Sequence, residues 1–565
     1  MILGIDLGTS NSMAAVYKEG QAVIIESRTG RKQIPSIVSI DEEGNFFAGD
    51  VAKERMVTYP ERTAGAFKRG MGTEQVYTIG GKQLKAVELS AIVLRNIKED
   101  AERFLGEEIR DAVISVPAFF SNPQRKAVIQ AGELAGFHVR QIINEPTAAA
   151  MAYGIQDKGL DDESPKSKVI MVMDLGGGTF DISIVEQTGD IMEVVAVCGD
   201  NHLGGEDFTK RLMNLFLEAN EIEGALEERE EAALWKQAEQ VKKEFGREEM
   251  GSIRCNIRGK DRHYEISEPD YEKACFDLLE RMRKLALKAI DESKYEMEDV
   301  SEILMVGGGM KLSVIQKMIN RLSGSRQEYK IDPDEAVVAG AALTGHLLEQ
   351  KYSVKDLIMT DICPYDLGCI IYEWTGYDFK NVFHTLMKKN TTIPAKRTYD
   401  KEARGDKKLR FTLYQANDKY VDEFVKLGKI SAYLPETEKG KCHVKITVIC
   451  DVNGIVKVEL YIRENRLKKE MLICNENCEL TIEEAKKRME ELQYLKSTPL
   501  EEEVNKLVYA RAERMYEECV GEERKRVGAY LEVFEQAISS FDEKKILYAR
   551  EQLTGLLDSL EKVVF

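Results

Sequence analysis

Two segments of the chain place an aspartate and one or more glycines directly after an apolar, strand-like stretch. The first is Asp6-Leu7-Gly8-Thr9-Ser10-Asn11, and the second is Asp174-Leu175-Gly176-Gly177-Gly178-Thr179-Phe180-Asp181. Glycine lets another group approach the backbone closely, and hydroxyl, amide and backbone N–H groups can hydrogen-bond phosphate oxygens. One such segment alone is typical of a hairpin turn, whereas two copies predict a pair of loops that clamp one polyphosphate.

Charged side chains near these loops could complete a polyphosphate site. Asp6 and Asp174 end their predicted strands, and carboxylates in that position suit Mg²⁺ held largely through water. Lys68 could bring positive charge to a terminal phosphate, although on its own it is typical of a solvated surface lysine. The stretch Val306-Gly307-Gly308-Gly309 also ends a predicted strand in glycines, which suits the nucleoside side of a nucleotide.

The two Asp-Leu-Gly segments belong to a longer internal repeat. Residues 2–16 and 169–185 each have the pattern strand, turn, strand, and amphipathic helices are expected at 87–105 and 208–217. The first 350 or so residues therefore predict two α/β lobes, with a ligand cleft between them.

The pattern changes near residue 355. Alternating strands such as 409–413 and 444–448 predict an all-β unit, and from Thr481 a capping box with Glu484 opens a helical segment. The strip 354–361 between the first two units is apolar and flanked by charge, unlike a Gly/Ser tether. The predicted limits are 1–352 for the α/β unit, 353–361 for the linker, 362–480 for the β unit and 481–565 for the helices.

Composition excludes several classes of protein. A net charge of −18 argues against a nucleic-acid surface, which needs an excess of Lys and Arg. No apolar run is long enough to span a membrane, and the first residues lead into a strand instead of a basic leader, so we expect a cytosolic protein without a membrane partner. The ten cysteines are dispersed and are expected to be reduced, and Cys474 and Cys478 lack the further ligands of a zinc site.

Eight motifs occur in order along the chain: DLGTSNS, SVPAFF, NEPTAAAMAYG, DLGGGTFD, HLGGEDF, MVGGG, DPDEAV and KKNTTIP. Together they resemble the DnaK-type heat-shock 70 kDa chaperones over nearly the whole chain. The resemblance implies an actin-like two-lobed α/β ATPase domain, then a β-sandwich that binds peptides, then an α-helical lid. A sugar kinase or an actin-like filament protein would share the phosphate loops but neither KKNTTIP nor the C-terminal half.

The resemblance also implies ligands and site residues. ATP or ADP with Mg²⁺ is expected, with K⁺ as a further candidate, and hydrolysis of ATP to ADP and phosphate is expected to be slow. Lys68 matches the family's essential phosphate lysine, while Glu145, Asp174, Thr179 and Asp181 match the groups that order Mg²⁺ and the attacking water. The implied phosphate contacts are Gly8, Thr9, Ser10, Asn11, Gly176, Gly177, Gly178 and Thr179.

Adenosine is expected to lie against a helix. Glu239, Lys242 and Lys243 fall at i, i+3 and i+4, so they share one face of a helix. Without the family resemblance, such a charged face is typical of a helix surface exposed to solvent. The family usually has Arg where Lys243 stands, and because Lys has no planar fork, weaker nucleotide binding is expected. The other implied nucleotide contacts are Gly205, Glu206, Gly307, Gly308, Gly309, Lys311 and Asp334.

Further residues are implied for coupling and for peptide binding. Pro117 and Arg125 match the family's relay between the cleft and the β domain, and Leu357 and Ile358 form the apolar centre of the linker. On one strand, Leu409, Phe411 and Leu413 alternate toward one face, where they could line the peptide cleft or the sandwich core beneath it.

Departures from the family pattern narrow the expectation. The segment between Phe245 and Tyr271 is short, the chain lacks a long acidic tail after the lid, and the loop 374–380 is aromatic. The first two suggest the HscC-like branch in the bacterial cytoplasm. Expected partners are unfolded or extended client polypeptides and a J-domain co-chaperone, while use of an exchange factor stays open. The alternatives are a nucleotide-regulated binder of one dedicated client and an actin-fold small-molecule kinase.

Overall fold

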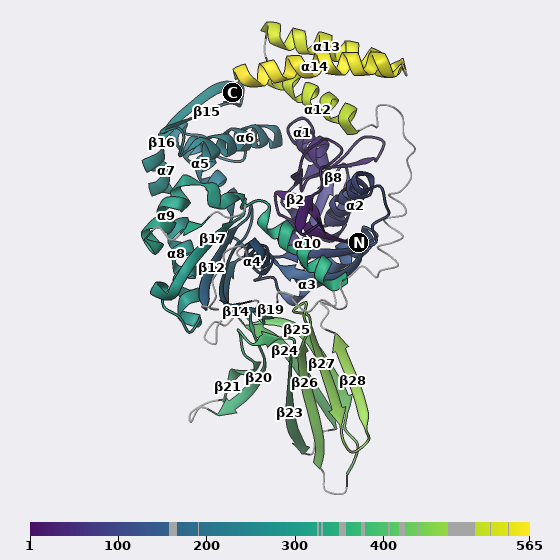
Figure 1. Cartoon of the computed structure of the whole chain (residues 1–565), viewed down its shortest axis with the longest axis vertical. Coiled ribbons are helices and arrows are strands. Elements are labelled where there is room, and N and C mark those ends of the chain that lie inside the picture. The colour runs from purple at the N-terminus through teal and green to yellow at the C-terminus, as the bar shows by residue number, and fades with distance from the viewer. Residues whose placement is uncertain are drawn as a thin grey trace.

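The computed structural model describes most of the chain. The described residues are 1–156, 167–189, 191–324, 327–328, 332–349, 358–374, 379–404, 407–416, 424–437, 441–472, 503–519, 521–540 and 542–564. Figure 1 shows an α/β part in the middle, paired strands below it and three helices above it. The predicted domain limits stay predictions, because residues 350–357 and 473–502 lie outside the described residues.

The first lobe is built on one mixed sheet. Its strands are β1 (Ile2–Asp6), β2 (Asn11–Lys18), β3 (Gln21–Ile24), β4 (Ile34–Pro35), β10 (Asp111–Val116) and β11 (His138–Asn144). Strand β1 runs antiparallel to β2 and parallel to β10, and β10 runs parallel to β11. Since four buried residues of β1 precede the half-buried Asp6, the strand delivers this carboxylate to the sheet edge.

The second lobe repeats this topology. Its strands are β12 (Lys168–Leu175), β13 (Phe180–Thr188), β14 (Ile191–Asp200), β17 (Val300–Val306) and β18 (Gln327–Glu328). The strand order β18-β17-β12-β13-β14 matches β11-β10-β1-β2-β3, with the same antiparallel and parallel neighbours. The predicted internal duplication and the two α/β lobes are therefore confirmed.

Helices and small hairpins complete the two lobes. The first lobe adds β5 (Val38–Ile40), β6 (Phe46–Ala48), β7 (Thr63–Ala64), β8 (Val76–Ile79), β9 (Lys82–Lys85), α1 (Asp50–Thr58), α2 (Ala86–Leu105), α3 (Asn122–Leu134) and α4 (Glu145–Gln156). The second adds β15 (Met250–Ile257), β16 (Lys260–Ser267), α5 (Gly205–Ala219), α6 (Glu228–Glu244), α7 (Glu268–Ala274), α8 (Phe276–Glu292), α9 (Ser313–Ser323) and α10 (Ala336–Glu349). The helices predicted at 87–105 and 208–217 correspond to α2 and α5.

Helix α3 illustrates how local sequence places a functional residue. The backbone N–H of Ser121 donates to Gln124 Oε1 at 2.9 Å, which is half of a capping box, and Pro123 lies in the first turn, where its missing N–H is tolerated. The helix therefore begins at Asn122, directly after its N-cap Ser121, and Arg125 follows within the first turn.

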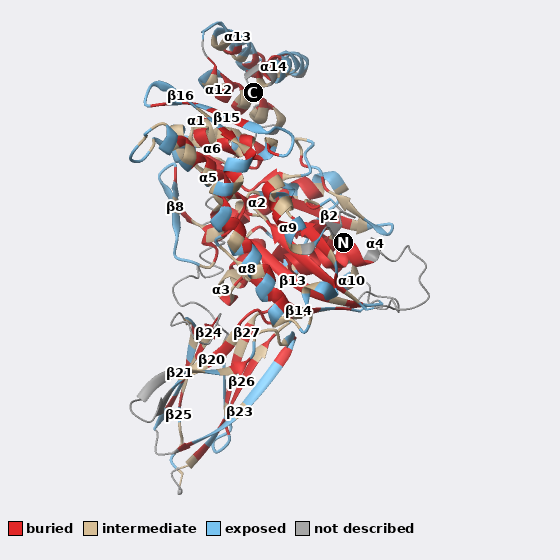
Figure 2. Ribbon diagram, turned by 90° about the vertical axis from the view of Figure 1, so that its left-hand side faces the viewer, coloured by how far each residue is buried: buried red, intermediate tan, exposed pale blue. Residues whose placement is uncertain are grey.

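The two lobes are joined by a helical seam. Although α10 follows the second lobe in the sequence, it packs against β1, β2 and α4 of the first. A Cβ at Gly340 would lie 1.8 Å from the Ala148 carbonyl oxygen, so only glycine permits this approach of α10 to α4. Figure 2 shows the buried interior of both lobes.

The β domain is a sandwich of two four-stranded sheets around one apolar core. The first sheet holds β20 (Asp366–Trp374), β21 (Phe379–Met387), β24 (Lys408–Ala416) and β25 (Val425–Tyr433), and the second holds β23 (Ala395–Arg404), β26 (Lys441–Cys450), β27 (Val456–Ile462) and β28 (Leu467–Leu472). The short strand β22 (Thr392–Ile393) pairs outside these two sheets. The strands predicted at 409–413 and 444–448 lie in β24 and β26.

One further strand, β19 (Ile358–Ile362), joins the α/β part to the sandwich. Its first half pairs in parallel with β14, at Ile191 with Ile358 and Met192 with Met359. Its second half pairs antiparallel with β22 of the β domain. The apolar strip is therefore a strand at the edge of the second lobe, and Leu357 lies outside the described residues.

The C-terminal part is helical, as predicted, with α12 (Glu503–Glu518), α13 (Gly521–Ser539) and α14 (Glu543–Val564) around a core of their own. The predicted start at Thr481 lies outside the described residues. In Figure 1, α12 lies against α1 of the first lobe. Within the described residues, no helix is long and apolar enough to cross a membrane.

Candidate functional site

The two Asp-Leu-Gly loops face each other across the lobes. A Cβ on Gly177 would lie 2.0 Å from Ser10 Oγ, and a Cβ on Gly178 would lie 3.0 Å from the Thr9 methyl carbon. Gly8 has a separate requirement, because its Cβ would lie 2.0 Å from the Asn11 carbonyl oxygen. The glycines therefore permit the close apposition that a clamp on one polyphosphate needs.

A buried ion pair lies beneath the loops. Lys68, in the 3₁₀ turn Phe67–Gly70, donates to Glu145 Oε1 at 2.7 Å, and the two residues are 3% and 7% exposed. Glu145 is the first residue of α4, where the positive end of the helix dipole favours a carboxylate. Two charges removed from water each need such a partner, so this pair keeps an ammonium in the interior, where its charge acts on Asp6, Asp174 and Asp181.

Three more carboxylates surround that pair. Strand pairing places Asp174 opposite Asp181 at the end of the β12–β13 hairpin, and Asp6 accepts a hydrogen bond from Ser115 Oγ at 2.7 Å. Burial, followed by the charge of Glu145, raises the pKa of Asp6 to about 6 and that of Asp181 to about 8, and it raises the pKa of Asp174 well above its ordinary value. Such crowding of desolvated acids favours a bound cation.

The donor set suits a cation held through water and phosphate. Among the described residues, no three or more His, Cys, Asp or Glu side chains converge closely enough to hold a metal ion by themselves. Mg²⁺ keeps several waters and binds one or two carboxylates plus substrate phosphates, which fits carboxylates spread around two phosphate loops.

A cavity of about 480 Å³ opens beside the loops, between the two lobes. Of the predicted nucleotide contacts, it includes Asn11, Lys243 and Asp334. The remaining lining residues were not predicted: Met13, Arg31, Lys32, Gln33, Pro35, Lys53, Asp332 and Glu335. Four of the lining side chains are cationic and three are acidic, and Lys32 pairs with Glu335 at 2.8 Å, so the cavity wall carries charges of both signs.

The predicted adenosine residues divide into two groups. Lys243 lines the cavity and pairs with Glu239 at 3.1 Å, as a shared helix face predicts. Lys242, however, turns inward to the Gly205 carbonyl at 2.9 Å, Thr209 Oγ1 at 2.8 Å and Glu239 Oε2 at 2.5 Å, so all three N–H donors are engaged. Lys242 therefore holds α6 against α5, and it does not line the cavity.

The remaining predicted contacts gather at the same cleft. Glu206 accepts from Ser10 Oγ at 3.2 Å, so α5 meets the first loop directly. A Cβ on Gly307 would lie 2.8 Å from Asp174 Oδ1, and one on Gly308 would lie 3.2 Å from Asp334 Oδ1. Lys311 is exposed, and its ammonium is 2.6 Å from Asp334 Oδ2.

Comparison with known proteins identifies the family. The family model described as Hsp70 protein matches residues 2–78 and 73–563. The proteins named Chaperone protein DnaK from Thermotoga neapolitana and from Thermosipho africanus are each 34% identical over 474 residues, which cover 81% of this chain and 77% of each relative.

The chain belongs to the Hsp70 family. The resemblance inferred from the eight motifs is thereby confirmed, and it extends through the C-terminal helices, because the Hsp70 match continues to residue 563.

The two residues predicted to relay between the cleft and the β domain, Pro117 and Arg125, lie where the lobes meet the β domain. Arg125 donates from Nη2 to the Ala118 carbonyl at 2.9 Å and to Asn144 Oδ1 at 2.7 Å, and from Nη1 to the carbonyl of Asn453 at 3.3 Å. Pro117 directly follows β10 and is buried, and its carbonyl accepts from the N–H of Phe120. Arg125 thus contacts the β domain on one side and the residue before Glu145 on the other.

Sequence reasoning missed several residues at the same junction. Asp361 of β19 accepts from Asn144 Nδ2 at 2.6 Å and from Thr147 Oγ1 at 3.1 Å. Phe119 donates its N–H to Asp181 Oδ1 at 3.0 Å, and its carbonyl accepts from the hydroxyl of Tyr365 in the β domain. These partners are 60 or more residues apart in the sequence, so no local pattern indicates them.

Arg69 was also missed as a site residue, although it directly follows Lys68. Its guanidinium pairs with Asp207 at 3.0 Å and with Glu206 at 3.6 Å. Its Nε is buried without a hydrogen-bond partner and lies 2.5 Å from the position of a Cβ on Gly178. The signal available in the sequence was a second cationic side chain directly after Lys68.

The predicted peptide-binding side chains form core. Leu409, Phe411 and Leu413 of β24 alternate with more exposed residues as predicted, but they are 6%, 7% and 0% exposed and pack inside the sandwich. In this structure they therefore serve the core instead of a surface cleft. The loop at 374–380 lies largely outside the described residues.

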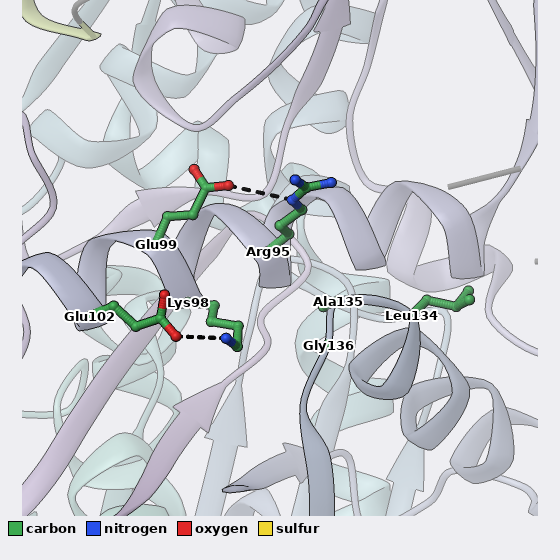
Figure 3. A pocket seen from close by; sticks show the side chains of 7 residues that line it. All are labelled: Arg95, Lys98, Glu99, Glu102, Leu134, Ala135 and Gly136. Carbon is green, nitrogen blue, oxygen red and sulfur yellow. Dashed lines mark hydrogen bonds and ion pairs between the residues drawn. The ribbon is translucent and has the colours of Figure 1, made fainter. Parts of the chain in front are cut away.

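A second hollow, of about 270 Å³, lies between α2 and the end of α3 (Figure 3). Its charged side chains pair along one helix, Arg95 with Glu99 at 3.4 Å and Lys98 with Glu102 at 2.6 Å. Because those charges satisfy each other, we interpret the hollow as an ordinary surface groove.

Proposed function

We propose that this Hsp70-family chain is an ATP-dependent molecular chaperone that binds and releases unfolded or extended apolar peptide segments under the control of slow ATP hydrolysis. The observation that carries the proposal is the continuous contact path from Glu145 and Asp181 in the cleft, through Asn144, Phe119 and β19, to the β domain. A small-molecule kinase has no use for such a path.

The chain's own residues divide the work of hydrolysis. The two loops hold the phosphates, Lys68 offsets charge at the γ-phosphate, and Thr179 with Glu145 orients the attacking water. Asp181 or Asp174 takes the proton of that water as it attacks phosphorus and the bond to the ADP oxygen breaks. When bound, Mg²⁺ would neutralise phosphate charge near Asp6 and Asp174, and a K⁺ ion would serve the same electrostatic purpose.

The wider setting follows from the family. Clients are unfolded or extended polypeptides, a J-domain co-chaperone is the expected partner, and the short segment between Phe245 and Tyr271 leaves an exchange factor open. Location in the bacterial cytoplasm is proposed on the same basis. A binder of one dedicated client is the second candidate, and its distinguishing observation would be a single hit in a peptide array.

The test is hydrolysis in the Lys68→Ala variant. Because Lys68 is buried against Glu145 and its ammonium is poised for the terminal phosphate, single-turnover hydrolysis of Mg·ATP should fall by at least about 100-fold, with ATP affinity within a few-fold of the wild type. Lys243→Ala is the matched control: this lysine lines the cavity, so its loss should weaken ATP binding and leave the hydrolysis step nearly unchanged. Wild-type hydrolysis in Lys68→Ala would contradict the proposal.

A further inference from the structure

The outer face of strands β24 and β25 carries a row of cationic side chains. Along β24, Leu409, Phe411 and Leu413 point into the sandwich core, whereas Lys408 and Arg410 alternate with them on the exposed side. Directly opposed residues of antiparallel strands share a face, so the register between β24 and β25 fixes which side chains lie beside these two cations.

Each outward cross-strand pair combines one cation with one hydroxyl group. Ammonium, guanidinium and hydroxyl groups can all donate hydrogen bonds to carboxylate oxygens. At about 3.4 Å per residue, the row is about 20 Å long, which matches an extended segment of six or seven residues. The four pairs are Lys408 with Tyr433, Arg410 with Ser431, Lys429 with Thr412 and Lys426 with Tyr414.

The charges of this cationic strip (Lys408, Arg410, Lys426 and Lys429) are not neutralised by described neighbours. Residues 407–416 and 424–435 contain five Lys and Arg side chains and no Asp or Glu. Within the described part of the chain, none of the four strip cations forms an ion pair. By contrast, three lysines of the second sheet each pair with a glutamate at 2.7 to 3.2 Å, namely Lys441, Lys457 and Lys468. The strip therefore keeps its positive charge available for a ligand.

Neighbouring side chains add one more cation and two apolar groups. Lys469 of β28 donates to the Ser431 carbonyl at 3.1 Å, which places a further ammonium beside β25. Tyr433 and Val425 lie at opposite ends of β25 and are 72% and 50% exposed. A ligand that matches this surface combines several negative charges with apolar groups.

The charge of the rest of the molecule favours a short ligand. Residues 358–472 carry a net charge of +5, although the whole chain carries −18, so the remainder carries −23. A nucleic acid or an anionic membrane extends beyond the strip and is repelled by that negative charge. An acidic polypeptide segment of six or seven residues is covered by the strip alone.

We propose that the outer face of β24 and β25 binds acidic segments of client polypeptides, so that the chain favours clients in which glutamates or aspartates flank an apolar stretch. This inference rests on the proposed chaperone function and names its class of client. The strip cations donate charge-assisted hydrogen bonds to the client carboxylates, and Tyr433 and Val425 contact its apolar side chains. Because exposed ion pairs are individually weak, the preference depends on several of them acting together.

The experiment measures the fluorescence anisotropy of three labelled peptides mixed with the full chain, ADP and Mg²⁺. The peptides share one apolar core and are flanked on both sides by glutamate, glutamine or lysine. The glutamate-flanked peptide should bind about 3- to 10-fold more tightly than the glutamine-flanked peptide at about 0.1 M salt, and the lysine-flanked peptide should bind most weakly. At about 1 M salt, where the Debye length falls from about 10 to about 3 Å, these differences should largely disappear.

Replacing two central cations tests whether the strip causes the preference. Arg410→Gln with Lys429→Gln should bring the affinities for the glutamate- and glutamine-flanked peptides within about 2-fold of each other, with the glutamine-flanked peptide bound as by the wild type. Arg410→Glu with Lys429→Glu should make the lysine-flanked peptide bind more tightly than the glutamate-flanked one. Both side chains are exposed, so the fold should tolerate these changes, and thermal unfolding checks that it does.

The matched control is Lys396→Gln with Arg397→Gln, which removes one lysine and one arginine from β23 of the second sheet. Both side chains are exposed, and the change in net charge is the same as in Arg410→Gln with Lys429→Gln. The control should keep the wild-type preference for the glutamate-flanked peptide. An equal loss of preference in the control would assign it to net charge and overturn the strip as the site.

The outcomes separate the two proposals. Failure of the wild type to bind any of the three peptides would overturn the proposed chaperone function. Normal binding with equal affinity for the glutamate- and glutamine-flanked peptides would overturn only the acidic-client inference. Oligothymidylate and phosphatidylserine vesicles serve as competitors, and tighter binding of either one, lost in Arg410→Gln with Lys429→Gln, would assign the strip to that polyanion instead.

Discussion

At the scale of single residues, the site contains buried charged side chains that do not by themselves stabilise the folded chain. Lys68 and Glu145 are buried together, and replacing such a pair with apolar residues is often neutral or stabilising. Asp174 and Asp181 add two more desolvated carboxylates on adjacent strands. We interpret this arrangement as stability given up for a site that is completed by phosphate and a cation.

The first prediction concerns Asp181→Asn in nucleotide-free protein with a metal chelator. Burial, followed by the charge of Glu145, raises the pKa of Asp181 from 3.8 to about 8. Between pH 3.8 and about pH 8 the folded chain keeps a proton on Asp181 that the unfolded chain has lost. The free energy of unfolding therefore falls as the pH rises through this range, and the loss of stability is complete above about pH 8. Asn cannot ionise and still accepts from the Phe119 N–H.

The measurement is denaturant unfolding of both proteins from pH 5 to pH 9. The stability advantage of Asp181→Asn should grow by about 2 to 4 kcal/mol between about pH 5 and pH 8 and then level off, at no more than about 1.4 kcal/mol per pH unit. The same variant should have lost ATP hydrolysis. Parallel stability curves across the pH range would show that Asp181 is not held protonated in the folded chain.

The sequence predicts residues of this cleft unevenly, for a physical reason. Asp174 and Gly177 belong to a short motif at a strand end, and Lys68 was found through the family resemblance; in the structure, the charge of Lys68 acts on Asp174. Lys53 and Asp361 carry no such local signature, because their importance comes only from what folds against them. Lys242 was placed on the correct helix, but its inward turn depends on the Gly205 carbonyl of another helix.

At the scale of elements, β19 is the connection on which coupling depends. It extends the sheet of the second lobe at β14 and pairs with β22, which contains part of KKNTTIP. Because β19 pairs with both units, it can transmit a change between them only while it stays paired with β14 and with β22. The apolar content of the strip distinguished it from a Gly/Ser tether, whereas its strand register could not be predicted, since strand partners lie far apart in the chain.

Met359→Asp tests that strand. Met359 packs partly buried against the apolar cluster between the lobes, so a carboxylate there should separate β19 from β14. Hydrogen exchange measured by mass spectrometry should show faster exchange at 191–193 and 358–360 in the presence of ATP, and peptide should no longer stimulate hydrolysis. Met359→Leu keeps the apolar contact and should behave like the wild type. Unchanged protection in Met359→Asp would mean that β19 is held by other contacts.

At the scale of the whole molecule, the β domain is docked at the lower end of the lobes and the helices at the upper end (Figure 1). Lys389 of the β domain pairs with Glu292 of α8 at 2.5 Å, and its ammonium lies 5.6 Å from the centre of the Phe119 ring. Nearby, Asn122 donates to the Gly454 carbonyl at 3.4 Å. Docking of the β domain therefore includes polar contacts that substitution can remove.

The last prediction concerns the ion pair between Lys389 of the β domain and Glu292 of α8. Lys389→Glu faces Glu292 with a like charge in a site where the side chains are 13% and 21% exposed, so docking of the β domain should weaken. ATP should then accelerate peptide dissociation at least about 5-fold less than in the wild type, while peptide affinity without nucleotide stays the same, because the coupling is lost and the sandwich is intact. The charge-swapped double variant, Lys389→Glu with Glu292→Lys, should recover the acceleration.

Lys388→Glu alters an exposed neighbour and should have no effect. Small-angle scattering in the presence of ATP should show a larger radius of gyration for Lys389→Glu than for the wild type or the charge-swapped double variant. Equal ATP-induced acceleration of peptide dissociation in Lys389→Glu and the wild type would exclude the Lys389–Glu292 contact from the coupling.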